Sequence, residues 1–154
     1  MSYYHLGEMY RDGIGTEKSG KNAVSWFKKA GNKGYYIAWY SIAQIYEKGC
    51  AEIAPDHEKA IEYYEMAERR GYMAAPYRFG DMYMKGDMVP KDRRKALEYY
   101  KRSADMGYYP ARMKLYTIYT EDPRFRNISE AGKMLDRMRR ENRGLLEKFA
   151  PKLL

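Results

Sequence analysis

Two patterns of apolar and polar residues alternate along the chain, and both have the spacing of helices. In the first pattern, an apolar residue and a tyrosine lie four positions apart and a glycine follows, as in LGEMYRDG (6–13), IAQIYEKG (42–49) and FGDMYMKG (79–86). Residues four apart lie on the same face of a helix. The pattern therefore predicts a helix with one apolar face, and LYTIYTED (115–122) is a degenerate fourth copy.

The second pattern follows each copy of the first and also predicts a helix. Its copies are NAVSWFKKAGNKGY (22–35), KAIEYYEMAERRGY (59–72), KALEYYKRSADMGY (95–108) and the degenerate EAGKMLDRMRRENR (130–143). An alanine and an aromatic residue lie four apart in the first three copies. Successive copies of the first pattern start 36 or 37 residues apart, so a unit of two helices is repeated four times.

The ends of these helices carry specific signals. Each second helix is preceded by a residue that caps helix N-termini well, worth about 1 kcal/mol over alanine. These residues are Ser19, Asp56, Asp92 and Asn127. Glycines that suit a left-handed C-terminal cap close the first helices at positions 13, 49 and 86, and glycines at 34, 71 and 107 end the second helices.

A small residue follows the apolar residue of the first pattern in three copies, as Gly7, Ala43 and Gly80. A residue without bulk at this place lets a neighbouring helix approach closely, which compensates for the low helix propensity of glycine. The fourth copy has Tyr116 there, so we expect looser packing in the last repeat.

One helix pair cannot bury its apolar face alone, so the pairs must stack into a curved superhelix. The sequence predicts an all-α solenoid of about four helix pairs, forming one domain over 1–154. We expect the repeats to span 1–36, 37–73, 74–109 and 110–143, with 144–154 as a C-terminal capping helix. In the last segment Leu145, Leu146 and Phe149 share one face. A cap over the last repeat is the main interpretation, and a basic helix on a membrane surface is the alternative.

Composition indicates a folded chain without a membrane span. Of the 154 residues 45% are hydrophobic and 32% charged, and no apolar run approaches the roughly 18 residues that a span requires. The N-terminus lacks the features of a secretion signal, and Cys50 is the only cysteine. We therefore expect a cytoplasmic protein, although a chain that had lost its signal peptide, or a fragment of a longer chain, would look the same.

The sequence offers no arrangement for catalysis, metal or cofactor binding. His5, His57 and Cys50 do not have metal-ligand spacing, and no phosphate-binding glycine loop or serine nucleophile motif is present. We predict a protein that is not an enzyme and that binds no cofactor.

The repeated unit resembles the Sel-one-like repeat family, a relative of the tetratricopeptide repeat. The resemblance rests on the apolar-Gly-x-Met-Tyr-x-x-Gly pattern, on Asp-x-x-Lys-Ala-x-x-Tyr-Tyr and on the closing glycine. It covers essentially the whole chain and is weak in the fourth copy. It implies a right-handed superhelix whose first helices line the concave face, and a role as an adaptor or scaffold that holds other proteins. The cysteines of a secreted, disulfide-stapled branch of the family are absent from this chain.

On that basis we expect a partner peptide or helix to contact the first helices on the side away from their core residues. The predicted partner-binding residues are Tyr4, Glu8, Arg11, Tyr40, Gln44, Glu47, Tyr77, Asp81, Met84, Met113 and Thr117. Tyr4, Tyr40, Tyr77 and Met113 form a ladder with one member per repeat. Tyrosine is favoured at interfaces, but packing between helices is the alternative role for these residues. The acids among the other residues favour a partner with some basic groups.

Charge supports a second function class. The net charge is +8, and residues 124–154 hold nine Lys or Arg against four Asp or Glu. Nucleic-acid binding, with RNA as the target, through the basic C-terminal repeat is therefore the alternative to protein binding. Binding dominated by phosphate contacts should weaken steeply with salt, whereas binding to an aromatic groove should not. Self-association through the terminal repeats is a third hypothesis.

Overall fold

The computed structural model describes residues 2–153, and their regular structure is helical apart from one bridge pair between Cys50 and Ile53. A short 3-10 helix, η1 (Pro151–Leu153), follows the last α-helix. The eight α-helices are α1 (Tyr3–Asp12), α2 (Gly20–Asn32), α3 (Ile37–Lys48), α4 (His57–Arg69), α5 (Ala74–Lys85), α6 (Arg93–Asp105), α7 (Tyr109–Glu121) and α8 (Ile128–Phe149).

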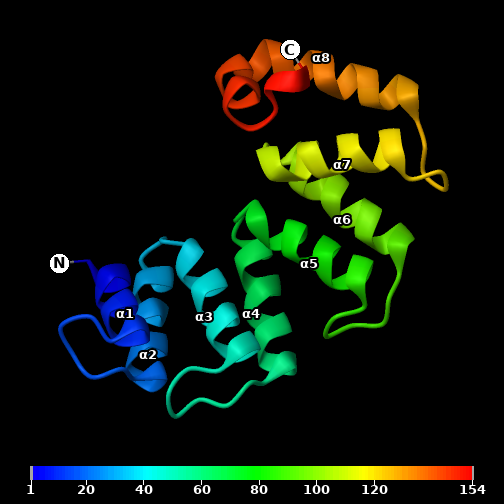
Figure 1. Ribbon diagram of the computed structural model, residues 1–154. Coiled ribbons are helices and arrows are strands. Elements are labelled where there is room, and N and C mark those ends of the chain that lie inside the picture. Colours follow the sequence, from blue (N-terminus) through cyan, green and yellow to red (C-terminus); the bar gives the residue numbers. More distant parts are fainter. Residues whose placement is uncertain (1, 154) are drawn as a thin grey trace.

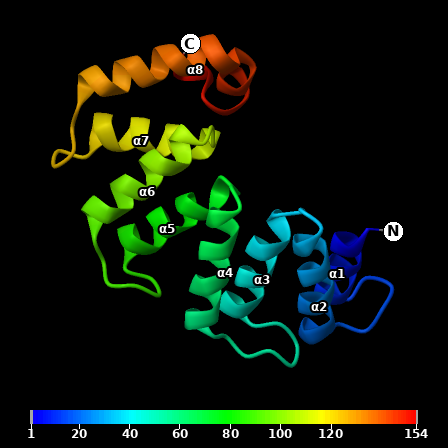
Figure 2. The same ribbon diagram turned by 180° about the vertical axis from the view of Figure 1, so that it is seen from behind.

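The helices pack in consecutive pairs, and the pairs stack into a curved array (Figure 1). The short connections α2–α3, α4–α5 and α6–α7 lie on the inner side of the curve in Figures 1 and 2, and the longer connections lie on its outer side. The predicted all-α solenoid of four helix pairs is confirmed. Within residues 2–153, no helix has both the length and the apolar character needed to cross a bilayer.

Helix starts follow the sequence signals closely. The side chain of each predicted N-cap residue accepts a hydrogen bond from the backbone N–H three positions later. These residues are Ser19, Asp56, Asp92 and Asn127. Ser2 caps α1 in the same way through the N–H of His5.

Three of the helices that open a repeat end at a glycine, and two of these ends have the predicted left-handed cap. Gly13 and Gly86 are left-handed and donate to the carbonyl four residues earlier. Gly49 differs, because its φ of 78° is combined with a ψ of 159°. The backbone at Gly49 is extended and leads into the bridge between Cys50 and Ile53. The predicted left-handed cap at Gly49 was therefore wrong.

The small residues of the first pattern do allow close helix contact. A methyl group on Gly7 would lie 2.5 Å from the ring of Phe27, and one on Gly80 would lie 2.5 Å from the ring of Tyr100. Both rings are fully buried. In the fourth repeat, which has Tyr116 at this place, α7 and α8 pack less extensively than the first three pairs.

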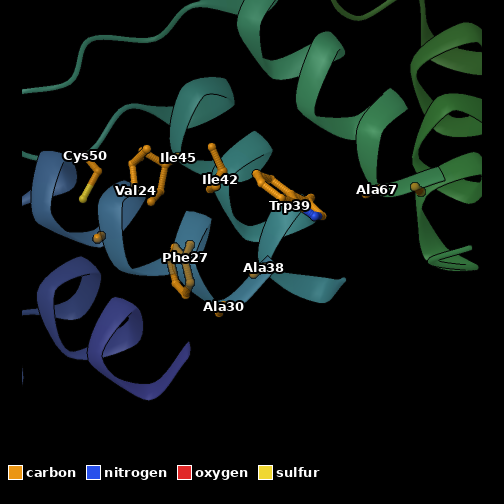
Figure 3. Close-up of a cluster of buried hydrophobic side chains, with 11 residues drawn as sticks. Val24, Phe27, Ala30, Ala38, Trp39, Ile42, Ile45, Cys50 and Ala67 are labelled. Atoms are coloured by element: carbon orange, nitrogen blue, oxygen red, sulfur yellow. The ribbon is translucent and has the colours of Figure 1, made fainter. Parts of the chain in front are cut away.

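The core is divided among the repeats rather than gathered at one centre. One cluster joins α2 to α3 through Val24, Phe27, Trp39 and Ile42, which Figure 3 shows. Trp39 lies against the backbone of Gly31, where any side chain would collide with its indole ring. The other two clusters join α3 to α5 and α6 to α8, so neighbouring repeats stabilise one another.

The C-terminal segment folds back on the last repeat. α8 bends at Asn142, whose φ of −155° and ψ of 65° are not helical, and the Asn142 side chain accepts a hydrogen bond from Leu145 N. Beyond the bend Leu146 is fully buried and Leu145 is half-buried. The side chain of Phe149, the third residue of the predicted capping face, lies outside the described residues.

Glu52, in the α3–α4 connection, binds the N-terminus of α2 across a repeat boundary. Its carboxylate accepts hydrogen bonds from the backbone of Gly20 and Lys21 and from the hydroxyl of Ser19. Hydrogen bonds from its own backbone N–H, from Lys21 and from Ser19 lower the pKa of Glu52 from 4.5 to about 2.

This lowered pKa predicts a pH-dependent contribution to stability. The ionised carboxylate favours the folded state, so its contribution is present above pH 4.5 and is lost as the pH falls towards 2. We expect Glu52→Gln to be less stable than wild type at pH 7, and the difference to shrink between pH 4.5 and 2. Urea unfolding at several pH values measures this, and a difference independent of pH would contradict it.

Candidate functional site

The three tyrosines of the predicted ladder each lie against a buried aromatic ring of the second helix in their repeat. The ring centroids are 5.1 Å apart for Tyr4 and Phe27, and 5.0 Å apart for Tyr40 and Tyr64. Tyr77 lies 5.4 Å from Tyr100 in the same way. The ladder tyrosines are half-buried, so they contribute to packing and still present one side to solvent.

A second column of tyrosines, which sequence reasoning missed, completes this surface. Tyr35, Tyr72 and Tyr108 follow the glycines that end α2, α4 and α6. Each contacts the ladder tyrosine of its own repeat edge-on, with centroids 4.9, 5.1 and 5.4 Å apart. The recurring Gly-Tyr pair was the signal for this column, but we had treated it only as a helix end.

These six residues form what we call the tyrosine surface: Tyr4, Tyr35, Tyr40, Tyr72, Tyr77 and Tyr108. Its second column lies in the short connections on the inner side of the solenoid (Figure 1). Burial raises the pKa of Tyr40 to about 12, and the nearby hydroxyls of Tyr72 and Tyr108 add to the shift. Burial, followed by the neighbouring hydroxyls of Tyr108, Tyr4 and Tyr35, likewise raises the pKa of Tyr72. The hydroxyls of Tyr40 and Tyr72 therefore stay protonated at neutral pH.

The hydroxyls of this surface are largely unsatisfied within the protein. Tyr4 shares a hydrogen bond of 3.1 Å with Ser41 of α3. In the described part of the chain, the other five hydroxyls have no hydrogen-bond partner. These groups are Tyr35, Tyr40, Tyr72, Tyr77 and Tyr108. They can therefore donate to an incoming ligand.

The acids predicted to face a partner are engaged inside the protein. Glu47 accepts hydrogen bonds from the hydroxyl of Tyr64 and from the guanidinium of Arg78. Asp81 accepts a bond of 2.7 Å from the hydroxyl of Tyr100. Burial, and then these hydrogen bonds, raise the pKa of both tyrosines.

The repeats differ in how they satisfy this buried ring. The equivalent of Tyr64 and Tyr100 in the first repeat is Phe27, which has no hydroxyl. The place of Glu47 is taken there by Arg11, whose guanidinium lies 6.0 Å over the Phe27 ring. Glu8 of that repeat pairs with His5 and Arg11. Glu47 and Asp81 thus act as acceptors for buried tyrosines, although the sequence had suggested that they offer charge to a partner. Glu8, at the place equivalent to Asp81, lies in the repeat whose buried ring has no hydroxyl.

The ion pair of Glu47 with Arg78 also joins the second repeat to the third. At this boundary α4 and α5 pack less extensively than α2 and α3, or α6 and α7, do at the other two boundaries. We expect Glu47→Ala to lower the free energy of unfolding by about 2–3 kcal/mol, because Tyr64 loses its acceptor and Arg78 keeps only Asp87 as a partner. Urea unfolding measures the loss. Glu62→Ala, at an exposed position of α4, is the control and should change stability by less than about 0.5 kcal/mol. Equal effects of the two variants would contradict this role.

Of the remaining predicted residues, Thr117 lies beside the ladder residues Tyr77 and Met113, whereas Arg11, Gln44 and Met84 lie elsewhere. Tyr77, Met113 and Thr117 line a hollow of about 500 Å³ together with Leu145 of the C-terminal segment. Arg11 and Gln44 line another hollow near Cys50, and Met84 packs against the core of the third and fourth repeats. All the predicted residues except Thr117 are half-buried, so they are less open to solvent than we expected.

The basic C-terminal repeat carries many internal ion pairs. Each of the four acids in residues 124–154 pairs with a Lys or Arg. The pairs are Glu130–Lys133, Asp136–Arg139, Glu141–Arg137 and Glu147–Arg143. Arg112 of α7 also binds Glu141. Much of the positive charge thus lies in i,i+3 and i,i+4 pairs along α8.

Other reactive side chains do not gather into a site. Among residues 2–153, no group of three or more His, Cys, Asp or Glu is placed to hold a metal ion. The thiol of Cys50 is buried and lies 3.6 Å from the carbonyl oxygen of Arg11. Burial raises the pKa of this thiol, which disfavours the reactive thiolate.

Stacked helix pairs with a repeated internal pattern define an α-solenoid repeat protein. The Sel1 repeat model matches residues 1–35, 37–72 and 74–108. The chain belongs to the Sel1 repeat family, as the resemblance of its repeats had indicated. The fourth helix pair lies beyond the matched residues.

Solved structures agree with this family. The chain is similar to a Sel1 repeat protein from Oxalobacter formigenes, with a TM-score of 0.72, 29% identity, and coverage of 87% of this chain and 54% of that one. It has the fold of a protective antigen from uropathogenic Escherichia coli strains, with a TM-score of 0.69, 22% identity, and coverage of 91% and 30%. The chain thus spans about half the length of the first protein and less than a third of the second. A comparison with curated proteins found no match.

Proposed function

We propose that this chain is a non-catalytic adaptor module that holds a peptide segment of a partner protein against its tyrosine surface. The observation that carries the proposal is the recurrence of this arrangement, with two tyrosines in contact in each of three repeats and five hydroxyls that make no hydrogen bond within the described part of the protein. Aromatic side chains with polar tips supply contact area at low entropic cost and are enriched at interfaces.

Membership of the family supports a binding role, because Sel1 repeat proteins typically act as protein interaction modules. The hydroxyls of Tyr40 and Tyr72 have raised pKa values, which suits hydrogen bonding and not nucleophilic or general base chemistry at neutral pH. The proposal therefore assigns recognition to this surface and catalysis to none of its residues.

A capture experiment tests the proposal. Wild type is compared with Tyr35→Ser/Tyr72→Ser in native lysate at low and moderate salt. Tyr35 is 53% exposed and Tyr72 is half-buried, and neither ring contacts the buried aromatic of its repeat. Tyr36→Ser is the control, since Tyr36 is 40% exposed and lies outside the tyrosine surface. We expect a protein that wild type and the control retain at both salt concentrations and that the double variant loses.

Two outcomes would contradict the proposal. One is a partner bound equally by all three proteins. The other is recovery of nucleic acid whose binding is lost at moderate salt and is the same in wild type and the tyrosine variants. That result would assign binding to the basic C-terminal repeat.

A further inference from the structure

A hollow of about 500 Å³ lies where the predicted ladder reaches the C-terminal segment, and its volume is in the range of ligand-binding pockets. Three elements line it, because Tyr77 belongs to α5, Met113 and Thr117 belong to α7, and Leu145 belongs to α8 beyond the bend. Figures 1 and 2 both place this end of α8 beside the start of α7. Tyr77 and Met113 are the last two ladder residues, so the hollow continues the ladder.

Two walls of the hollow are held in place by contacts within the protein. The ring of Tyr77 packs against the rings of Tyr100 and Tyr108, with a centroid distance of 5.4 Å in each case. Leu145 is positioned by the bend in α8, since its backbone N–H donates to the side chain of Asn142. A site that is already formed loses little freedom when an occupant enters it, which favours binding.

The surface of the hollow is mostly apolar, and the hollow is open to solvent on one side. Covering apolar surface removes it from water, which is favourable roughly in proportion to the area. An open hollow cannot enclose a small molecule, whereas a chain segment that lies along the ladder can insert one large apolar side chain as an anchor. The geometry therefore suits a segment of another protein that presents such a side chain.

Charge indicates which groups should flank that side chain. Lys114 is the only charged residue among the described residues that line the hollow, and it makes no ion pair or hydrogen bond within residues 2–153. Burial and then the charge of Asp81 raise the pKa of Tyr77, but Asp81 does not line the hollow and accepts the hydrogen bond of Tyr100. The four acids of residues 124–154 are paired within the chain. A carboxylate in the occupant would thus gain a partner, and a basic group would be repelled.

From these observations we infer that the hollow binds an acidic segment of a partner protein, which inserts a large apolar side chain beside Met113 and places a carboxylate against Lys114. The inference rests on the proposed function, because Tyr77 belongs to the tyrosine surface as well, and it names the chemistry of the partner. It replaces the expectation of a partner with basic groups. Two of the acids behind that expectation, Glu47 and Asp81, accept hydrogen bonds inside the protein.

Fluorescence anisotropy with three labelled peptides tests the inference. The acidic probe is Gly-Glu-Glu-Leu-Phe-Glu-Glu-Gly, the second peptide has lysine in place of each glutamate, and the third has Ser-Ser in place of Leu-Phe. We expect the acidic probe to bind wild type about tenfold or more tightly than either of the others.

Two variants assign this binding to the hollow. Lys114→Glu should reverse the preference, so that the lysine peptide binds more tightly than the acidic one, a gain that an unfolded variant could not show. Lys85→Glu makes the same charge change at an exposed position outside the hollow and should keep the wild-type preference. Met113→Ser removes apolar surface without changing charge, and it should weaken binding of the acidic probe about fivefold or more.

Several results would overturn the inference. They are equal or tighter binding of the lysine peptide to wild type, an unchanged preference in Lys114→Glu, and equal affinity of wild type and a folded Met113→Ser for the acidic probe. Decanoate, a carboxylate on an apolar chain, is a further probe. Binding of decanoate that depends on Lys114, without binding of the acidic peptide, would assign the hollow to a small amphiphile instead.

The outcomes also separate this inference from the adaptor function. If the acidic probe fails these tests while capture from lysate still depends on Tyr35 and Tyr72, the adaptor function stands and the acidic occupant is wrong. If the probe binds through Lys114 and Met113 while capture ignores Tyr35 and Tyr72, the hollow is a binding site and the role of the tyrosine surface is wrong. If both experiments fail, both proposals fail.

Discussion

Tyr100→Ala is expected to lower the free energy of unfolding by about 3–5 kcal/mol, as truncation of a fully buried aromatic does. The Tyr100 ring is inaccessible to solvent, packs on the backbone at Gly80, and supports Tyr77 of the tyrosine surface. Small domains are stable by only about 5–15 kcal/mol, so a large part of the total would be lost. Urea unfolding followed by circular dichroism measures the change.

Tyr100→Phe is the matched control for this prediction. It keeps the ring and removes only the hydrogen bond to Asp81, so the loss should be about 1 kcal/mol. The first repeat already carries phenylalanine, Phe27, at the equivalent place. If the alanine and phenylalanine variants were equally unstable, the hydroxyl would be the important group and ring packing would not.

Gly7→Leu is expected to destabilise the first repeat by about 3 kcal/mol, because the added side chain collides with a ring that cannot move away. Even a methyl group at Gly7 would lie 2.5 Å from Phe27, whose ring is fully buried between α1 and its neighbours. Thermal unfolding and hydrogen exchange in α1 and α2 measure the effect.

Gly132→Leu provides a control of opposite sign. Gly132 lies inside α8, and a methyl group added to it would meet no other atom within 4 Å. We expect a gain of up to about 1 kcal/mol from the higher helix propensity of leucine. A loss in Gly132→Leu as large as that in Gly7→Leu would show that the loss does not depend on contact with the Phe27 ring.

Local signals in the sequence were sufficient for the fold. The capping residues Ser19, Asp56, Asp92 and Asn127 act within three residues of their own position, so their roles could be predicted without knowledge of the tertiary structure. The need for small residues at Gly7 and Gly80 was equally visible, because the same place recurs in each repeat. Gly49 was mispredicted because its conformation depends on the bridge to Ile53 in the following loop.

The candidate site was less predictable, because its residues meet only after the helices pack. Tyr35, Tyr72 and Tyr108 lie outside the helices, yet they join the ladder through edge contacts across the repeat. Glu47 and Asp81 looked like charges offered to a partner, since their acceptor role depends on rings far along the chain. Helical spacing identifies a shared face, but it does not identify which buried hydroxyl an acid must satisfy.

The central claim, that a partner segment occupies the tyrosine surface, is tested most directly by NMR of the ring-labelled tyrosines. The chain has 18 tyrosines, and those away from the surface include Tyr63, stacked on Tyr46, and Tyr99, stacked on Tyr83. Titration with the captured partner's minimal binding segment should shift the signals of Tyr35, Tyr72 and Tyr108 and leave those stacked pairs unchanged. Shifts confined to the stacked pairs, or saturation of binding without any tyrosine shift, would contradict the claim.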